Sequence, residues 1–397
     1  MHREILENIF SVGFVDWHVR DFHGYETSQG STYNAYLVKD EKTALIDTVK
    51  EPYAADLLAN ITELVPLDQI DYIVCNHAEP DHAGALAEVM AAIPGATLLC
   101  DKKCKTILSK HFDISGWNIQ VVEGGETVSL GKRSLRFYET PMVHWPESMA
   151  TYVPEEKLLF SMDAFGQHYA TSGWFDDEVP ISTAMAEAKT YYANIVMLYG
   201  EEVAKLLAPG VLPEIEIIAP SHGVIWRKYV NDILDAYRDW CVFRPVPKVL
   251  VLFDTMWQST ERMARAISEG ATVAGVEVKV IHVRRSNLTI IADEVLDAAC
   301  VAVGTSTLNQ QMMPMMGATL TYLKGLSPRN KAGFAFGSFG WSKGGAGDVE
   351  EILREMEWEI TRKAIRSPYR PTDEILEECR QAGEELAIKA LETACAD

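Results

Sequence analysis

The chain has 397 residues, of which 48% are hydrophobic and 23% charged, a composition typical of a folded globular protein. Single cores stop growing near ~250 residues, so we expect two domains. The net charge of −21 argues against nucleic-acid or anionic-lipid partners, and the lack of an 18-residue apolar run argues against a membrane span.

The first 240 residues mix extended and helical patterns. Apolar, β-rich runs predict strands, and stretches with helical spacing of apolar residues lie between them. We expect strands at residues 32–38, 42–49, 71–76, 133–140, 157–163 and 214–220, and helices at 51–65 and 229–240. Several of these strands end in a polar loop that contains His or Asp, which predicts a site along one edge of a sheet.

A linker is expected at residues 241–248, because "CVFRPVPK" places two prolines between a polar helix and an apolar strand. It divides the chain into a domain of residues 1–245 and a domain of residues 246–397. Beyond it we expect strands at 248–253, 276–283, 300–304 and 331–336, and helices at 260–270, 290–299, 347–357 and 372–391. This alternation predicts an open, mostly parallel, doubly wound sheet that binds ligands at the carboxyl ends of its strands.

The seven cysteines are scattered and include no C-x-x-C pair. The N-terminus, "MHREILENIFSVGF", lacks the basic leader and apolar stretch of a secretory signal. We therefore expect reduced, mostly buried thiols and a cytoplasmic location.

The segment "NHAEPDHAG" places four metal-ligating side chains within six positions, directly after an apolar strand: His77, Glu79, Asp81 and His82. In an extended loop, His77 and Glu79 can point to the same side, and the proline before Asp81 is expected to stiffen a turn. Local geometry permits one metal ion or two, but a loop alone supplies too few fixed ligands. Partners are therefore expected at other strand ends.

Three partners fit this expectation. They are His144 in "PMVHWPESM", Asp163 in "LLFSMDAFGQH" and His222 in "IIAPSHGVIW". With the loop they supply at least three imidazoles and three carboxylates. This is the ligand set of a dinuclear site with a bridging carboxylate.

The order of these motifs resembles the metallo-β-lactamase fold, whose loop has the form H-x-[HE]-x-D-H. In the zinc hydrolases of that fold the third position is usually His. Glu79 stands there in this chain, which therefore resembles the flavodiiron proteins, also called A-type flavoproteins or rubredoxin:oxygen oxidoreductases. The resemblance covers essentially the whole chain and implies an α/β protein: an N-terminal metallo-β-lactamase-like αββα sandwich plus a C-terminal flavodoxin-like doubly wound parallel sheet.

The resemblance implies two iron ions. The ligands of the first iron would be His77, Glu79 and His144, those of the second Asp81 and His222, and Asp163 would bridge them. His82 would either ligate the second iron or turn away, and we group it with the catalytic residues. Hard anionic oxygen ligands such as Glu79 favour iron or manganese, so this site suits ferrous redox chemistry better than a zinc-bound hydroxide.

Sequences near the ligands also match the family: "DFHGYETSQGSTYNAYLV", "HWPESM" and "YYANIV". From these, His23 and Tyr191 are expected to donate hydrogen bonds to a bound substrate.

The apolar strand "KVLVLF" is followed by "DTMWQSTERMA", where Thr255, Ser259 and Thr260 lead into a helix. Hydroxyls and backbone N–H groups at a helix start form a phosphate cradle, and the lack of G-K-[ST] argues against a nucleoside triphosphate. The motif resembles the flavodoxin loop T/S-x-T-G-x-T, although Trp257 and Gln258 stand where Thr and Gly are common.

Two later loops, "VGTSTLNQQMMP" and "FGSFGWSKGGAGD", also follow strands and are expected to hold an isoalloxazine ring. Gly337 and Gly340 would let the backbone approach that ring. Ser306 and the Asn309-Gln310 pair replace residues that are usual in the family, which would retune the flavin potential. The expected FMN-binding residues are Thr255, Met256, Trp257, Gln258, Ser259, Thr260, Ser306, Thr307, Leu308, Asn309, Ser338, Phe339, Gly340 and Trp341.

The resemblance implies an oxidoreductase that reduces dioxygen to water, nitric oxide to nitrous oxide, or both. Two ferrous ions and one flavin hydroquinone hold four electrons, which is enough for one dioxygen. No rubredoxin-like C-x-x-C pairs follow the flavin half, so electrons would come from a separate donor such as rubredoxin. The family also implies a head-to-tail homodimer or a dimer of dimers, in which the flavin of one subunit serves the irons of another.

Two alternatives stay open. The first is a zinc-dependent hydrolase of the metallo-β-lactamase fold fused to a flavodoxin-like domain, and the second is an FMN electron carrier with a vestigial metal site. Dioxygen and nitric oxide also both stay open as substrates, because enzymes of both preferences share these ligands.

Overall fold

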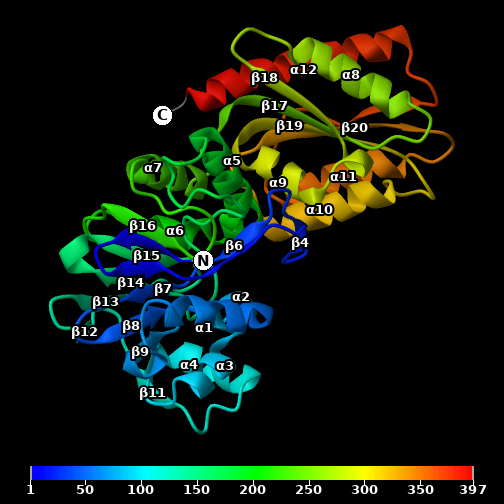
Figure 1. The fold of residues 1–397 in the computed structure, drawn as a ribbon. Helices are drawn as coiled ribbons and strands as arrows, with labels where there is room; N and C mark the ends of the chain where they lie inside the picture. The colour runs from blue at the N-terminus through cyan, green and yellow to red at the C-terminus, as the bar shows by residue number, and fades with distance from the viewer. Residues whose placement is uncertain (1, 396–397) are drawn as a thin grey trace. The chain divides into compact units, whose positions relative to one another are not determined.

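The computed structural model describes residues 2–395, which form two compact units (Figure 1). The N-terminal unit holds the chain up to Tyr192 together with Glu201–Arg238. The C-terminal unit holds Ala193–Gly200 together with the chain from Asp239. The predicted domain boundary between residues 245 and 246 stays a prediction.

The first sheet of the N-terminal unit has seven strands in the order β1-β2-β7-β8-β9-β10-β11. Their bounds are β1 (Arg3–Leu6), β2 (Ile9–Ser11), β7 (Tyr36–Val38), β8 (Thr43–Ile46), β9 (Ile70–Val74), β10 (Thr97–Cys100) and β11 (Asn118–Val121). Neighbouring side chains on a strand point to opposite faces. Leu45 accordingly packs in a core with residues of the helices α1 (Ala54–Thr62), α3 (Leu86–Ala92) and α4 (Lys102–His111), whereas Ile46 packs in a second core.

That second core lies between the first sheet and a five-stranded sheet, because Ile46 shares it with Phe137 and Phe160 of the second sheet. The second sheet consists of β12 (Thr127–Ser129), β13 (Ser134–Glu139), β14 (Met149–Val153), β15 (Leu158–Met162) and β16 (Ile217–Pro220). Figure 1 shows both sheets between α1 on one side and α5 (Ile181–Tyr191) on the other. This layering is the predicted αββα sandwich.

Two short strands outside these sheets form a hairpin-like pair of their own. β3 (Phe14–Asp16) runs antiparallel to β6 (Ser31–Tyr33), with Phe14 opposite Tyr33 and Asp16 opposite Ser31. Another two-stranded sheet joins β4 (Asp21–Phe22) to β5 (Tyr25–Glu26).

The sheet of the C-terminal unit is entirely parallel, with the order β18-β17-β19-β20-β21 and with β22 beside β20. Its strands are β17 (Val246–Phe253), β18 (Glu277–His282), β19 (Ala298–Ser306), β20 (Ala332–Phe339), β21 (Glu359–Ile360) and β22 (Ile365–Pro368). Counted from β17, this is the strand order 2-1-3-4-5 of the flavodoxin type. The predicted doubly wound sheet is therefore confirmed.

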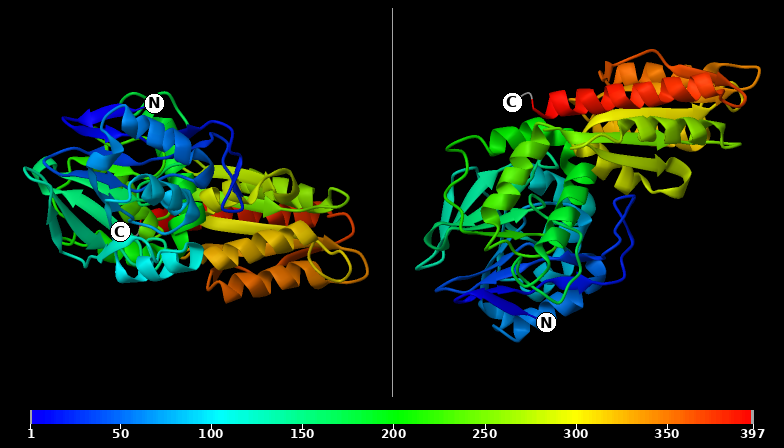
Figure 2. Two further views of the ribbon diagram at one scale, coloured as in Figure 1. Left: turned by 60° about the horizontal axis from the view of Figure 1, so that its bottom comes forward. Right: turned by 90° about the horizontal axis from the view of Figure 1, so that it is seen from above.

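Helices cover both faces of this sheet (Figure 2). Met263 of α8 (Ser259–Ala271) and Leu386 of α12 (Asp373–Ala394) pack in the core on one face. Val295 of α9 (Leu288–Asp297), Leu320 of α10 (Pro314–Leu326) and Val349 of α11 (Gly344–Glu355) pack in the core on the other face.

The structure differs from the expectations for the second half of the chain in three places. The helix α10 was not predicted, because its methionine run and its two glycines obscure the helical spacing, although Met316 and Leu320 are fully buried. Ala298 and Ala299 were assigned to a helix but begin the buried strand β19. The expected linker is shorter than residues 241–248, because α7 (Val230–Cys241) continues to Cys241 and β17 already starts at Val246.

Most of the cysteine side chains are buried, as predicted. Six of them are buried, and Cys395 is exposed.

Candidate metal centre and flavin pocket

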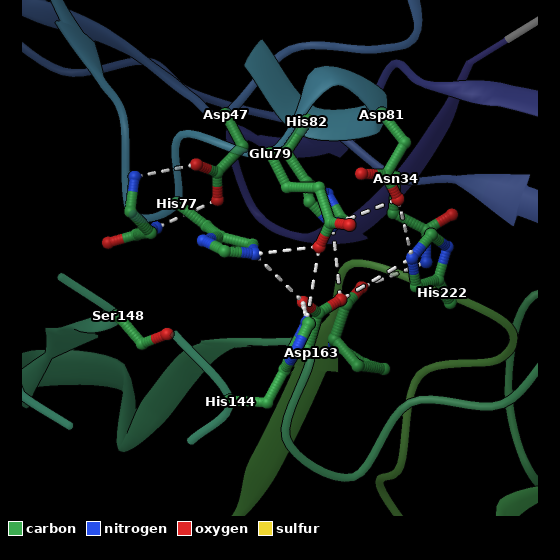
Figure 3. A network of polar contacts seen from close by, with 12 residues as sticks. Asn34, Asp47, His77, Glu79, Asp81, His82, His144, Ser148, Asp163 and His222 are labelled. Atoms are coloured by element: carbon green, nitrogen blue, oxygen red, sulfur yellow. Dashed lines mark hydrogen bonds and ion pairs between the residues drawn. The ribbon is translucent and has the colours of Figure 1, made fainter. Parts of the chain in front are cut away.

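The seven predicted ligand side chains gather at the ends of strands β9, β15 and β16 and in the loop before β14 (Figure 3). His77 and Glu79 lie in the loop after β9. The expected turn after Glu79 is instead the short helix α2 (Pro80–Ala83), which carries Asp81 and His82. Proline suits the first position of a helix because its missing N–H would have no partner there.

The first group of side chains surrounds Glu79 and one oxygen of Asp163. Nε2 of His77 lies 3.0 Å from Oε2 of Glu79 and 3.5 Å from Oδ2 of Asp163. Nε2 of His144 lies 3.2 Å and 3.1 Å from the same two oxygens. Two imidazoles and two carboxylates therefore point at one small volume.

The second group surrounds Asp81 and the other oxygen of Asp163. Nε2 of His82 lies 3.1 Å from Oδ2 of Asp81 and 3.1 Å from Oδ1 of Asp163. Nε2 of His222 lies 3.1 Å and 3.4 Å from the same two oxygens. His82 therefore points into this group, and Asp163 contacts both groups with different oxygens.

Many of these atoms are buried and have no hydrogen bond within the described residues. These atoms are the two carboxylate oxygens of Asp81, the two ring nitrogens of His82, Oδ1 of Asp163 and Nε2 of His222. Four of them lie 3.1–3.4 Å from an opposite charge but without hydrogen-bond geometry. Buried polar atoms without a hydrogen bond are costly, so such a concentration needs an explanation. A set of donor atoms that converge on cations supplies one.

The electrostatics of the cluster show how strongly it attracts positive charge. Burial would raise the pKa of the Glu79 carboxyl, but hydrogen bonds with His144, His23 and His77 hold that pKa well below its usual range. Burial would also raise the pKa of Asp163, but the charge of His82 and a hydrogen bond with His144 lower it strongly. These carboxylates therefore stay ionised in the folded protein.

The pKa values of two histidines in the cluster are shifted upwards. Burial would lower the pKa of His144, but hydrogen bonds to Asp163 and Glu79 raise it to about 9. Burial would likewise lower the pKa of His222, but its contacts with Asp163 and Asp81 raise it to about 10. Protons therefore hold these rings near neutral pH when no metal competes for them.

In His77 and His222 the other ring nitrogen, Nδ1, is held by the surrounding structure. Nδ1 of His77 lies 2.8 Å from Oε1 of the buried Glu147. Nδ1 of His222 donates to the carbonyl of Thr32 at 2.6 Å, and Asn34 holds the loop of His222 through the carbonyls of Pro220 and Gly223. Such contacts orient a histidine so that Nε2 faces a metal.

His23 and Tyr191, the two predicted substrate donors, both lie beside the cluster. Nε2 of His23 is 2.9 Å from Oε1 of Glu79. The Tyr191 ring is 6.0 Å from the His222 ring, and its buried hydroxyl has no hydrogen bond within the described chain. The hydroxyl of Tyr191 is therefore available to a further group.

His168 was missed by the sequence analysis. It is buried, its ring lies 4.8 Å from the His222 ring and 4.9 Å from the Tyr191 ring, and its Nδ1 is 2.7 Å from Oγ of Ser31. Nε2 of His168 has no hydrogen bond within the described residues. The signal was available in the sequence, because His168 follows Asp163 in the same quoted segment.

The C-terminal unit contains a cavity of about 920 Å³ at the carboxyl ends of β17, β19 and β20. Eleven of the fourteen predicted FMN-binding residues line it: Met256, Trp257, Ser259, Ser306, Thr307, Leu308, Asn309, Ser338, Phe339, Gly340 and Trp341. Trp257 and Trp341 are 84% and 94% exposed, so their rings are open to a ligand. Arg262, Gln310, Ser342, Tyr369 and Arg370 also line the cavity. Gln310 and Ser342 belong to the two loops expected to hold the ring, whereas the other three were not predicted.

The other three predicted residues, Thr255, Gln258 and Thr260, do not line the cavity: Thr255 and Thr260 are buried and Gln258 is exposed. Oγ1 of Thr260 lies 3.0 Å from the hydroxyls of both Ser306 and Ser338, so it ties two cavity loops together. The hydroxyl of Thr255 is buried and has no hydrogen bond within the described residues. The start of the 13-residue helix α8 adds free backbone N–H groups, which suit a phosphate.

Gly337 lies where two strands pair closely, and its approach to the ring stays a prediction. A Cβ at this position would lie 2.0 Å from the carbonyl oxygen of Thr305. Gly337 therefore permits the close pairing of β20 with β19. Around Gly340 the nearest atom to such a Cβ would be 3.5 Å away, so that position has room.

Comparisons with known proteins agree with both halves of this description. The family model "ODP family beta lactamase" matches residues 32–223, and the model "Flavodoxin" matches residues 251–383. The nitric oxide reductase of Moorella thermoacetica is 43% identical to this chain over 97% of it and 98% of that protein.

Solved structures are similar over the whole length. The rubredoxin oxygen:oxidoreductase of Desulfovibrio gigas has a TM-score of 0.96 and 38% identity, with all of both chains covered. The flavodiiron protein of Giardia intestinalis has a TM-score of 0.96 and 38% identity, covering 99% of this chain and 98% of that one. Among the described residues, no helix is long and apolar enough to cross a membrane. The chain belongs to the flavodiiron family of oxidoreductases, with a β-lactamase-like domain followed by a flavodoxin-like domain.

Proposed function

We propose that the N-terminal cluster holds two iron ions. His77, Glu79 and His144 would ligate the first, Asp81, His82 and His222 the second, and Asp163 would bridge them. The main support for this proposal is the position of the Asp163 carboxylate. Each of its two oxygens faces a separate pair of histidines. The inclusion of His82 rests on the two 3.1 Å contacts of its Nε2.

The charges of the donor set favour iron over zinc. Three carboxylates offset most of the charge of two divalent ions, and hard oxygen donors stabilise the more oxidised metal. Glu79 matters most for this preference, because it lies in the group that contains His77 and His144. The zinc hydrolases of this fold usually have a neutral imidazole at its position. The cluster therefore suits metal ions that change oxidation state.

We propose that the cavity of the C-terminal unit binds FMN. The hydroxyl of Thr255 and the start of α8 suit the phosphate, and the exposed rings of Trp257 and Trp341 suit an isoalloxazine. The cavity volume of about 920 Å³ is within the range of cofactor sites.

Together the cofactors would supply electrons for the reduction of dioxygen to water, of nitric oxide to nitrous oxide, or of both. The names of relatives support both substrates, since one is a nitric oxide reductase and another a rubredoxin oxygen:oxidoreductase. On the protein side, His23 and Tyr191 would donate hydrogen bonds to the bound gas, and the buried surroundings of Asp163 and His222 would exclude water.

The same comparisons support a separate electron donor, and we propose rubredoxin. We also propose a head-to-tail homodimer, or a dimer of dimers, and a cytoplasmic location. Analytical ultracentrifugation and reduction by purified rubredoxin would test the first two of these points.

The function is tested by mixing the chemically reduced holoprotein with dioxygen and, separately, with nitric oxide in a stopped-flow instrument. We expect consumption of at least one gas, and we expect the Asp163→Asn variant to lose it. Unchanged gas consumption by Asp163→Asn would show that the metal cluster is not the reaction site and would favour the electron-carrier alternative. Stoichiometric zinc together with esterase turnover would favour the hydrolase.

A further inference from the structure

A row of aromatic rings leads away from the metal cluster within the N-terminal unit. The Tyr33 ring lies 6.2 Å from the ring of His222. The Tyr53 ring stacks 5.5 Å from Tyr33, and the Phe14 ring stacks 3.8 Å from Tyr53. Tyr33 is fully buried, whereas Tyr53 and Phe14 are half-buried, so the row connects the cluster with the surface.

One carboxylate serves both tyrosines of this row. The hydroxyl of Tyr53 donates to Oδ2 of Asp16 at 2.8 Å, and the hydroxyl of Tyr33 lies 3.3 Å from the same oxygen. The other oxygen of Asp16 accepts from the backbone N–H groups of His18 and Val19. The pairing of β3 with β6 places Asp16 and Tyr33 on the same face of a small sheet, since opposite and diagonal residues share a face.

We propose that Tyr33 and Tyr53 form a path by which oxidising equivalents leave the metal centre for the protein surface, with Asp16 accepting the phenol proton. This inference rests on the proposed diiron function. The path would operate when dioxygen reacts with a centre that holds fewer electrons than complete reduction to water requires. It would then protect the iron ligands from oxidation.

The step is balanced in electrons and protons. Tyr53 would give up one electron by way of Tyr33, and the oxidant would be dioxygen consumed at the N-terminal cluster when that cluster holds iron. The O–H bond of Tyr53 breaks, and its proton moves to Oδ2 of Asp16. The products are a neutral tyrosyl radical and a neutral carboxyl group. A thiol or ascorbate in solution then returns one electron to the half-buried Tyr53, Asp16 returns the proton, and the reductant releases its own proton to solvent.

A positive charge beside Tyr33 means that oxidation of the row requires a group that accepts the phenol proton. Nζ of Lys50 lies 5.9 Å from the Tyr33 ring centre, and this positive charge disfavours a radical cation on that ring. Burial would raise the pKa of Asp16, but hydrogen bonds from Tyr53, His18 and Val19 lower it, so Asp16 is ionised and able to accept. Burial and Asp16 raise the pKa of Tyr53 to about 12, so Tyr53 keeps its proton until it is oxidised.

Trp145 and Tyr191 offer competing exits from the cluster. The Trp145 ring lies 5.0 Å from the His77 ring and the Tyr191 ring 6.0 Å from the His222 ring, and both distances are shorter than that from Tyr33 to His222. Within the described residues, however, no carboxylate accepts a hydrogen bond from the Trp145 indole or the Tyr191 hydroxyl. Asp16 therefore favours the route through Tyr33 and Tyr53.

The test uses the iron- and FMN-loaded protein, reduced by only two electron equivalents per chain and mixed with excess dioxygen without a donor. Samples are frozen within milliseconds to seconds and examined by electron paramagnetic resonance. We expect a tyrosyl signal that narrows when ring-deuterated tyrosine is incorporated. A tryptophanyl signal, or no protein radical while the same sample consumes dioxygen, would overturn the proposal.

Variants assign the radical. We expect the Tyr33→Phe/Tyr53→Phe double variant to lose the signal. Asp16→Asn should also lose most of it, since Asn can keep the turn to His18 and Val19 but cannot accept the phenol proton. Tyr152→Phe is the matched control, because its hydroxyl donates to the carbonyl of Glu214 and is separate from the row.

A second measurement reports the protective role. After repeated exposure to dioxygen without a donor, mass spectrometry of peptides should show more oxidation at His77 and His82 in the double variant than in the parent or Tyr152→Phe. Equal oxidation in all three would contradict protection. A failure of the diiron proposal would look different, because the parent protein would then bind no iron and consume no dioxygen.

Discussion

Oδ1 of Asp163 lies 3.1 Å from Nε2 of His82, and both atoms are buried. Because the other oxygen of Asp163 faces His144, we predict that His82→Ala leaves the first metal position intact and empties the second. Metal analysis should show a fall from two ions per chain to about one. His111→Ala, an exposed histidine, is the control and should keep both ions. Two tightly bound ions in His82→Ala would contradict a ligand role for His82.

Glu147 should control how tightly the first position holds its metal. It is fully buried, and its Oε1 lies 2.8 Å from Nδ1 of His77 and 3.1 Å from the backbone nitrogen of Ala78. Loss of such a supporting contact usually weakens metal affinity by about 10–100-fold. We expect a weakening of this size for Glu147→Ala in a chelator competition assay. An unchanged affinity would mean that His77 is oriented by other contacts.

Metal uptake should release protons and strengthen with pH. In the metal-free protein the pKa values of His144 and His222 are about 9 and 10, so both rings are protonated at pH 7. A metal ion must displace these protons, because it binds the neutral ring. We therefore expect apparent affinity to rise with pH up to about these values and to fall in acid. Calorimetry in buffers of different ionisation enthalpy measures the protons released, and a release of zero would refute this account.

Thr255→Val separates flavin binding from stability. The Thr255 hydroxyl is buried and unpaired within the described residues, so an isosteric apolar side chain should leave the stability of the flavin-free protein unchanged or slightly higher. If this hydroxyl binds the phosphate, FMN affinity should fall by about tenfold, or about 1.4 kcal/mol. Fluorescence titration with FMN and thermal unfolding without it measure the two effects. Equal FMN affinity in both proteins would remove Thr255 from the site.

The strand pattern was predictable because it depends on local chemistry. The alternation at Leu45 and Ile46 and the buried run of β17 follow from apolar spacing alone. The helix α10 was not predictable in this way, since Met316 and Leu320 are buried by tertiary packing that overrides a weak local pattern. The same holds for Ala298 and Ala299, because β17 pairs with this end of β19 and the two side chains pack in the cores on opposite faces of the sheet.

The ligands could be predicted because they end strands in a recognisable order, and the resemblance also implied how they divide into two groups, with only His82 left open. Whether His82 turns towards Asp163 depends on the helix α2, and a loop sequence does not fix that rotation. Similarly, Tyr369 and Arg370 line the flavin cavity from a segment that lies far along the chain from the predicted loops. Such contacts have no signature in a single sequence.

The most direct test of the central claim is Mössbauer spectroscopy of protein purified without oxygen and loaded with ⁵⁷Fe, combined with flavin analysis of the same sample. The proposed function predicts two irons per chain in a magnetically interacting pair, together with one FMN. Iron that occurs only as isolated ions, or protein that takes up neither iron nor flavin after reconstitution, would contradict it.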